Sequence, residues 1–322
     1  MKPTSLCRGA ALAAALVVAA GAALAQETTL NAVLFVPRNT TFGEIFVRFV
    51  DHANREGKGV VQIKLIGGPD AIPTFEQGNA VKSGVVDMAS VAPTFYTNFC
   101  PECDAQILAP QQTPQLKKTP FWAVLQKYTN QKVNAQLISA YGDGIGFHIW
   151  TSKPPSGGML KGMRLRTTPN YTPLFTALGV SLVQTPPGEV LTALERGVVD
   201  GYGWPAIGIF DLGWGAHTKY RLDPGFYNVV VNVLVNLNKW NSLREDQRAF
   251  LNRMAGWLES ENVRWVQERK AADDKKIKDA GIQILNLGPG HRKLAYDAYW
   301  EALAKRAPEP IKELRAASDA LR

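Results

Sequence analysis

Arg166 is the side chain of this sequence best suited to binding an anion. It lies near the end of a short alternating segment, residues 163–167, in which Arg164 and Arg166 face one side of a predicted strand. A guanidinium presents a planar fork of N–H groups that matches a carboxylate in two parallel hydrogen bonds. Taken alone, an arginine more often forms an ordinary structural ion pair. The polar side chains that follow, Thr168 and Asn170, could add hydrogen bonds to a ligand.

The elements that must position Arg166 lie in residues 163–205. The apolar pattern predicts three strands with two helices between them: strands at 163–167, 180–185 and 198–200, and helices that end at Gly179 and Gly197. Strands and helices that alternate in this way form a largely parallel sheet. Because ligands bind beyond the carboxyl ends of such strands, Arg166 and a predicted loop at 201–205 would meet there.

Three motifs in this region carry a family resemblance. They are Leu-Lys-Gly-Met-Arg-Leu-Arg at 160–166, Ala-Leu-Gly at 177–179, and Glu-Val-Leu-Thr-Ala-Leu-Glu-Arg-Gly-Val-Val-Asp-Gly at 189–201. In order and spacing, the chain resembles the solute-binding proteins of TRAP transporters, the DctP-type family, and weaker matches extend over nearly all of it. The resemblance implies that Arg166 holds the carboxylate of an organic acid.

The same resemblance implies an α/β fold of the two-lobed periplasmic binding protein type. Each lobe would be a mixed, mostly parallel sheet flanked by helices, and one long helix would span both lobes. That helix is predicted at about 243–280, with Ser242 and Glu245 as a capping box at its start and Gly281 at its end. The predicted division is 26–143 plus about 228–256 for the first lobe, and 144–227 plus about 257–322 for the second.

Residues 1–25 have the pattern of a secretory signal peptide. Lys2 and Arg8 give a positive start, residues 10–20 are apolar, and Ala23-Leu24-Ala25 is a cleavage site of small residues. The apolar run is shorter than the ~20 residues that span a membrane. We therefore expect cleavage after Ala25 and a periplasmic protein.

The remaining 297 residues are long enough for two lobes of about 150 residues each. Their formal net charge is +6, because the signal peptide takes two of the eight excess positive charges. The charge is spread along the chain without a basic block, so nucleic-acid binding is not expected, and it mildly favours anionic ligands. No further apolar run is long enough to insert the mature chain into a membrane.

An internal similarity suggests that both lobes offer aromatic side chains to a shared cleft. Residues 80–88, with a predicted strand at 85–88, parallel residues 193–201: each has a helix end, a glycine, a buried strand and an aspartate. Aromatic residues follow each copy, and these predicted cleft walls are Phe95 and Tyr96 in the first and Tyr202 and Trp204 in the second. The alternative is coincidence, since glycine commonly ends helices.

Other candidate ligand contacts are Phe42, Trp150 and His148. Phe42 begins a predicted helix after Asn39-Thr40-Thr41, where a buried helix start is an equally good explanation. Trp150 would add a wall. His148 stands where the family pattern Gly-x-Arg-x-x-Thr has an arginine, so a second fixed positive charge is in doubt; a neutral hydrogen bond or a purely structural role are the alternatives.

The segment after Asp200 also bears on the ligand. A family branch that binds keto acids through a metal has a glutamate beside a tryptophan here, and this chain has Gly203 instead. We therefore expect neither a metal nor a cofactor. The aromatic residues favour a ligand with an apolar or ring portion.

Cys100 and Cys103 are the only cysteines after the signal peptide. The absence of a second cysteine pair excludes a four-cysteine zinc site, and no close histidine pair completes a mixed one. In an oxidising compartment a local structural disulfide is favoured over free thiols or redox activity.

The sequence thus predicts a periplasmic binding protein that captures a carboxylate between two lobes and delivers it to the membrane subunits of a TRAP permease. A partner that presents its ligand to a membrane sensor is an alternative. A secreted hydrolase is a weaker one, because the chain has neither a Gly-x-Ser-x-Gly nor a His-Glu-x-x-His motif and its four histidines are scattered. We predict no catalytic residue.

Overall fold

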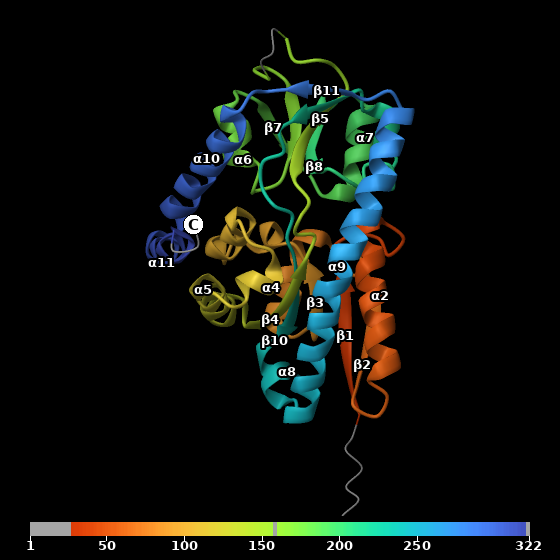
Figure 1. Ribbon diagram of the computed structural model, residues 1–322, viewed down its shortest axis with the longest axis vertical. Helices are drawn as coiled ribbons and strands as arrows, with labels where there is room; N and C mark the ends of the chain where they lie inside the picture. The colour runs from red at the N-terminus through yellow and green to blue at the C-terminus, as the bar shows by residue number, and fades with distance from the viewer. Residues whose placement is uncertain (1–26, 157–159, 320–322) are drawn as a thin grey trace, which may run out of the picture.

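The computed structural model describes residues 27–156 and 160–319. The predicted signal peptide, residues 1–25 with its cleavage site, lies outside the described residues. Two separate sheets organise the described chain, and helices flank both of them (Figure 1).

The first lobe is built on a five-stranded sheet with the strand order β2-β1-β3-β10-β4. Its strands are β1 (Thr28–Leu34), β2 (Val61–Gly67), β3 (Met88–Val91), β4 (Ala135–Tyr141) and β10 (Val231–Asn236). Among these described strands only β10 runs against the others. The helices of this lobe are α2 (Thr41–Glu56), α3 (Gln77–Ser83), α4 (Thr113–Leu116), α5 (Pro120–Tyr128) and α8 (Leu237–Ser242).

The second lobe is built on a six-stranded sheet with the order β11-β9-β5-β8-β6-β7. Its strands are β5 (Phe147–Thr151), β6 (Arg164–Thr167), β7 (Ser181–Gln184), β8 (Gly201–Pro205), β9 (Tyr220–Asp223) and β11 (Gln283–Asn286), with helices α6 (Thr172–Ala177) and α7 (Val190–Glu195). Within the described part of this sheet β5 alone is reversed. The predicted fold class, two lobes with mixed and mostly parallel sheets, is confirmed.

Two crossings between the lobes run side by side as an antiparallel ribbon. The first follows β4 and the second follows β9. The Phe147 N–H donates to the Tyr227 carbonyl at 3.0 Å, and the Val229 N–H donates to the Ile145 carbonyl at 2.9 Å. These bonds join the two crossing segments into a short, hydrogen-bonded connection between the lobes.

The third connection is helix α9 (Glu245–Asp279), which runs beside α2 and reaches from the first lobe to the second (Figure 1). At the second lobe, Asp273 accepts a hydrogen bond from the Gly208 N–H at 2.5 Å. The predicted long helix is confirmed, but the Ser242 capping box is wrong. Ser242 ends α8 and its hydroxyl donates to the Lys239 carbonyl, because the chain is extended at Leu243 before α9 begins.

The C-terminal helices α10 (Gly290–Arg306) and α11 (Pro308–Asp319) lead back from the second lobe to the first. Helix α11 lies against α5, where Lys127 and the Tyr128 hydroxyl both bind Glu313 (Figure 1). This placement differs from the predicted division, which put all of 257–322 in the second lobe. A sequence pattern identifies α11 as amphipathic but does not indicate which neighbour its apolar face meets.

Both copies of the internal similarity adopt the same local structure. Gly84 after α3 and Gly197 after α7 have φ of +80° and +62°. Asp87 then accepts from the Asn31 N–H at 2.9 Å, and Asp200 accepts from the Arg164 N–H at 2.9 Å. Each aspartate thus joins its segment to the neighbouring parallel strand.

The strand that follows each aspartate begins later than predicted. In the first lobe the strand is β3 (Met88–Val91) rather than 85–88, and in the second it is β8 (Gly201–Pro205) rather than 198–200. The predicted loop at 201–205 is therefore wrong. Its glycines suggest a turn, but they serve close packing instead: a Cβ on Gly201 would lie 2.2 Å from the Trp150 carbonyl oxygen.

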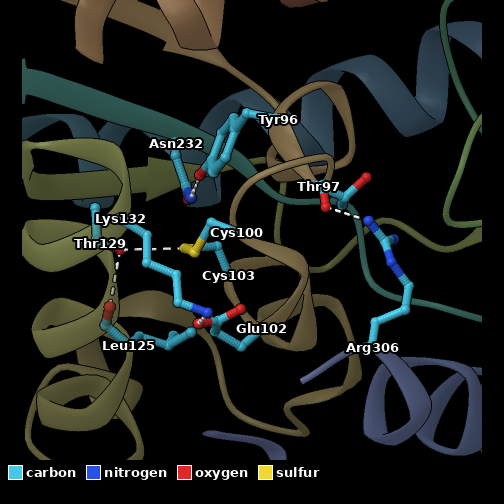
Figure 2. Close-up of a disulfide and its surroundings, with 10 residues drawn as sticks. All are labelled: Tyr96, Thr97, Cys100, Glu102, Cys103, Leu125, Thr129, Lys132, Asn232 and Arg306. Atoms are coloured by element: carbon cyan, nitrogen blue, oxygen red, sulfur yellow. Dashed lines mark hydrogen bonds and ion pairs between the residues drawn. A yellow bond between two sulfur atoms is a disulfide. The ribbon is translucent and has the colours of Figure 1, made fainter.

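Cys100 and Cys103 form a disulfide at the start of the 3₁₀ helix η3 (Pro101–Leu108), all of whose residues are buried (Figure 2). Below the disulfide the buried Glu102 carboxylate pairs with Lys132 at 2.5 Å, and the Thr129 hydroxyl lies 3.7 Å from Cys103 Sγ. The disulfide therefore closes a short loop at the start of a buried 3₁₀ helix.

We expect the variant carrying both Cys100→Ala and Cys103→Ala to lose about 2 kcal/mol of unfolding free energy, because the closed loop restricts the unfolded chain. Urea denaturation without reductant would measure this. Cys100→Ala alone should lose nearly as much, since one cysteine cannot form the bond. Equal stability of the double variant and the unmodified protein would contradict a stabilising disulfide.

Candidate ligand-binding site

A buried cavity lies between the two lobes. Its volume, taken over the positions that the centre of a water molecule can occupy, is about 40 Å³. That is room for ~3 water molecules, or for a ligand that displaces them. Six of the predicted site residues line it: Phe42, Phe95, Arg166, Thr168, Asn170 and Trp204.

Arg166 is fully buried near the end of β6 and is one of the residues that line this cavity. Its Nε donates to the Thr185 carbonyl at 2.9 Å, and its Nη1 donates to the Gly203 carbonyl at 3.3 Å. Nη2 has no partner among the described residues, and no carboxylate in that part of the chain pairs with the guanidinium. Burial lowers the pKa of Arg166 to about 10, so the group stays charged at neutral pH.

The apolar wall of the cavity is aromatic and comes from both lobes. The Arg166 guanidinium lies 5.9 Å from the centre of the Trp204 ring. Phe42, from the first turn of α2, meets Trp204 edge-on at 6.2 Å. Across the cavity, Phe95 packs against Phe35 at 5.7 Å. A ligand between these rings would exchange water for apolar surface.

Hydrogen bonds close the two lobes over the cavity. Thr94, on η2 (Pro93–Tyr96) of the first lobe, donates to Asn170 Oδ1 of the second at 3.1 Å, and the Asn170 N–H donates back to Thr94 Oγ1 at 3.2 Å. Thr168 also donates to Asn170 Oδ1 at 2.5 Å. Asn170 therefore joins the segment after Arg166 to the opposite lobe.

Four predicted contacts are buried but are absent from the described lining of the cavity: Tyr96, His148, Trp150 and Tyr202. The Tyr96 hydroxyl accepts from Asn232, and that of Tyr202 lies 2.6 Å from the Thr218 hydroxyl. Their predicted role as cleft walls has no support from this cavity.

His148 and Trp150 lie on β5, one strand removed from Arg166. The Nδ1 of His148 lies 2.9 Å from a carboxylate oxygen of Asp223, and the Trp150 indole donates to the Trp204 carbonyl at 3.1 Å. These partners belong to the second lobe itself. The contacts of His148 within the second lobe agree with the alternative interpretation, a purely structural role.

Sequence reasoning missed several lining residues, among them Thr94, Asp104, Phe147 and Tyr171. Phe147 belongs to the segment that crosses between lobes, and Tyr171 follows Asn170 directly. The adjacency of Asp104 to the cysteine pair was a usable signal, because a disulfide that fixes a segment also fixes the side chain next to it.

The Asp104 carboxylate is fully buried on η3. Its Oδ2 accepts a hydrogen bond from the Tyr299 hydroxyl, whereas its Oδ1 has no partner in the described parts of the chain. Burial raises the pKa of Asp104 to about 7, although the bond from Tyr299 and the charge of Arg306 act in the opposite direction.

No cluster of three or more histidine, cysteine or acidic side chains suited to a metal ion occurs in the described residues. Nor does any helix described here have the length and apolarity needed to cross a membrane.

The family model for bacterial extracellular solute-binding proteins, family 7 (DctP), matches residues 32–308. The chain belongs to this family. The resemblance to TRAP-transporter solute-binding proteins is thereby confirmed, and the DctP family is a family of binding proteins rather than a class of enzymes.

One curated relative is a monocarboxylate 2-oxoacid-binding periplasmic protein of a Nostoc species, 28% identical over 206 residues. The match covers 60% of this chain and 56% of the relative, so this chain spans little more than half of that protein's length.

Solved structures of TRAP periplasmic solute-binding proteins share the fold. The protein of Desulfovibrio salexigens, with bound orotic acid, has a TM-score of 0.80 at 20% identity, covering 91% of this chain and 97% of that one. The protein of Rhodoferax ferrireducens, with bound malonate, has a TM-score of 0.79 at 16% identity, covering 90% and 97%.

The unfolding free energy of the unmodified protein should fall as pH rises from about 4 to about 7, and we expect Asp104→Asn to make this fall smaller. The folded protein retains a proton on Asp104 over the range in which the unfolded chain has released it, so unfolding free energy falls as pH rises. The difference between an ordinary pKa of 3.8 and about 7 corresponds to at most roughly 4 kcal/mol. Urea denaturation at several pH values would measure it.

His291 has the opposite effect on the pH dependence of stability. Burial lowers its pKa to about 4, so the unfolding free energy that it contributes is lost as pH falls below 6.5. The unmodified protein and Asp104→Asn both carry His291, so the difference between their curves of unfolding free energy against pH isolates Asp104. Parallel curves would show that Asp104 does not titrate as described.

Proposed function

We propose that this DctP-family protein captures a small organic acid in the interlobe cavity and delivers it to the membrane subunits of a TRAP permease. The observation that carries the proposal is the buried Arg166 guanidinium, which belongs to the cavity lining and whose Nη2 has no hydrogen-bond partner among the described residues. A carboxylate would accept from this group and neutralise a charge that is costly to bury.

Lobe closure supports capture rather than surface adsorption. Arg166, Thr168 and Trp204 come from the second lobe, whereas Phe42 and Phe95 come from the first. A ligand meets both groups only when the lobes are together, so binding and closure are linked. The two sheets support the proposed lobe division for the strands, with α11 reassigned to the surface of the first lobe.

The ligand class follows from the cavity together with the relatives. A single fixed positive charge within aromatic walls suits one carboxylate on an apolar or ring-containing body. The relatives are named for 2-oxoacid, orotic acid and malonate ligands, all of which carry a carboxylate. We propose a carboxylate ligand for this chain on the same grounds.

The proposed place of action is the periplasm, with cleavage of the signal peptide after Ala25. The family is extracellular by description, and the curated relative is periplasmic. Since the proposed task is capture and release, the driving force for uptake would belong to the permease.

We expect Arg166→Ala to abolish carboxylate binding, lowering affinity at least 100-fold, because the ligand loses a charged hydrogen-bond donor in a buried site. Isothermal titration of the mature protein, after a thermal-shift screen of mono-, di- and keto-acids, would measure the change.

Arg164→Ala is the matched control. Arg164 lies two residues away on the same strand, but its side chain is 47% exposed and pairs with Asp200 outside the cavity. Its removal should leave affinity within about twofold. A carboxylate that binds Arg166→Ala as tightly as the unmodified protein would refute the assigned site.

A further inference from the structure

A second charged side chain lines the cavity besides Arg166. Asp104 lies on η3, the 3₁₀ helix held by the Cys100–Cys103 disulfide, and its side chain contributes to the cavity wall. It belongs to the first lobe, whereas Arg166 belongs to the second. The cavity lining therefore has a carboxyl group from one lobe and a guanidinium group from the other.

The two groups do not neutralise each other. Among the described residues neither a hydrogen bond nor an ion pair joins Asp104 to Arg166. Tyr171 lines the cavity as well, and its hydroxyl responds to the charges of both. Because both side chains line the same cavity, a ligand in it can contact Arg166 with one group and Asp104 with another.

Asp104 is held in a fixed orientation with one oxygen unused. The Tyr299 hydroxyl, on α10, donates to Oδ2, and Arg306 of the same helix donates to the Thr97 carbonyl close by. Oδ1 is buried, and nothing in the described chain donates to it. A buried oxygen without a donor is costly, so a ligand that supplies one gains affinity.

We infer that Asp104 determines ligand specificity: the ligand carries, besides its carboxylate, a hydrogen-bond donor that Asp104 Oδ1 accepts. Hydroxyl, amide N–H and ammonium groups share this chemistry. The inference rests on the proposed function, since it assumes that Arg166 holds the carboxylate. It adds that the ligand is a hydroxy, amide-bearing or amino acid rather than an unsubstituted or oxo acid.

The charge around Asp104 supports an acceptor role. Burial favours the protonated carboxyl, whereas the Tyr299 hydrogen bond and the charge of Arg306 favour the ionised form, which a donor from the ligand would favour further. The resulting pKa of about 7 for Asp104 means that little energy separates the two protonation states near neutral pH. A hydrogen-bond donor of the ligand at Oδ1 is then enough to stabilise the ionised Asp104 carboxylate, whose oxygens can only accept hydrogen bonds.

The experiment compares acids of one carbon skeleton that differ only at carbon 2 or carbon 3. Each set contains the unsubstituted, hydroxy, amino and oxo members, in three- to five-carbon and phenyl-substituted series. Isothermal titration of the mature protein should show a hydroxy or amino member binding at least tenfold more tightly than its oxo and unsubstituted counterparts. Whether the hydroxyl or the ammonium binds better distinguishes a neutral from a cationic donor.

Asp104→Asn then tests the residue itself. The asparagine Oδ1 can still accept from Tyr299, which turns the amide N–H₂ toward the ligand in place of an acceptor. The variant should lose at least tenfold affinity for the hydroxy or amino member and gain affinity for the oxo member. A purely structural role of Asp104 would not reverse the preference.

Glu102→Gln is the control, because Glu102 is a buried carboxylate on the same 3₁₀ helix that lies outside the described cavity lining. It should keep the order of affinities. The inference is overturned if the unmodified protein prefers oxo or unsubstituted acids, a result that does not depend on the folding of any variant. It is also overturned if Asp104→Asn weakens all members equally. If no carboxylate binds at all, the proposed function fails, and this inference fails with it.

Discussion

A positive charge buried without a counter-ion is the constraint on which the ligand site depends. Transferring an ionised group from water into a protein interior costs several kcal/mol unless other charges or dipoles compensate. The only hydrogen-bond acceptors of Arg166 in the described chain are the Thr185 and Gly203 carbonyls, yet its lowered pKa of about 10 keeps it charged. Under the proposed function, a bound carboxylate would supply the missing partner. The cost of burying this charge would then be the source of the affinity for the ligand.

The surrounding strands explain how this charge is held in place. Arg166 lies on β6, while its two carbonyl partners come from the end of β7 and from β8 on either side. Gly203 is required at this point, because a Cβ there would lie 2.6 Å from the Tyr171 ring. The ring can pack against the strand only because glycine has no side chain. The glycine that replaces a glutamate of one family branch thus has a packing role here.

The sequence was sufficient to predict the fold class and the long helix, and to select Arg166, which lines the interlobe cavity, because periodicity, helix-ending glycines and family motifs are local signals. The prediction of a loop at 201–205 was wrong because a glycine can indicate either a turn or a tightly packed strand. Gly201 and Gly203 were interpreted as part of a loop, but they allow close packing within a strand. Tyr202 is an aromatic beside the site in sequence but is bonded within its own lobe. Asp104 was missed because its hydrogen-bond partner, Tyr299, is 195 residues away in the sequence.

The two lobes share a plan but differ at the position that matters for charge. Asp87 and Asp200 make the same bond, to the Asn31 and Arg164 N–H groups, so these strands correspond residue by residue. Two positions further along, the second lobe has Arg166 where the first has Val33, and both side chains are fully buried. The first lobe thus contributes no fixed positive charge at the equivalent position. Under the proposed function, this strand position would therefore recognise an anion in one lobe only, and the other lobe would contribute the aromatic side chains of Phe35 and Phe95 to the cavity.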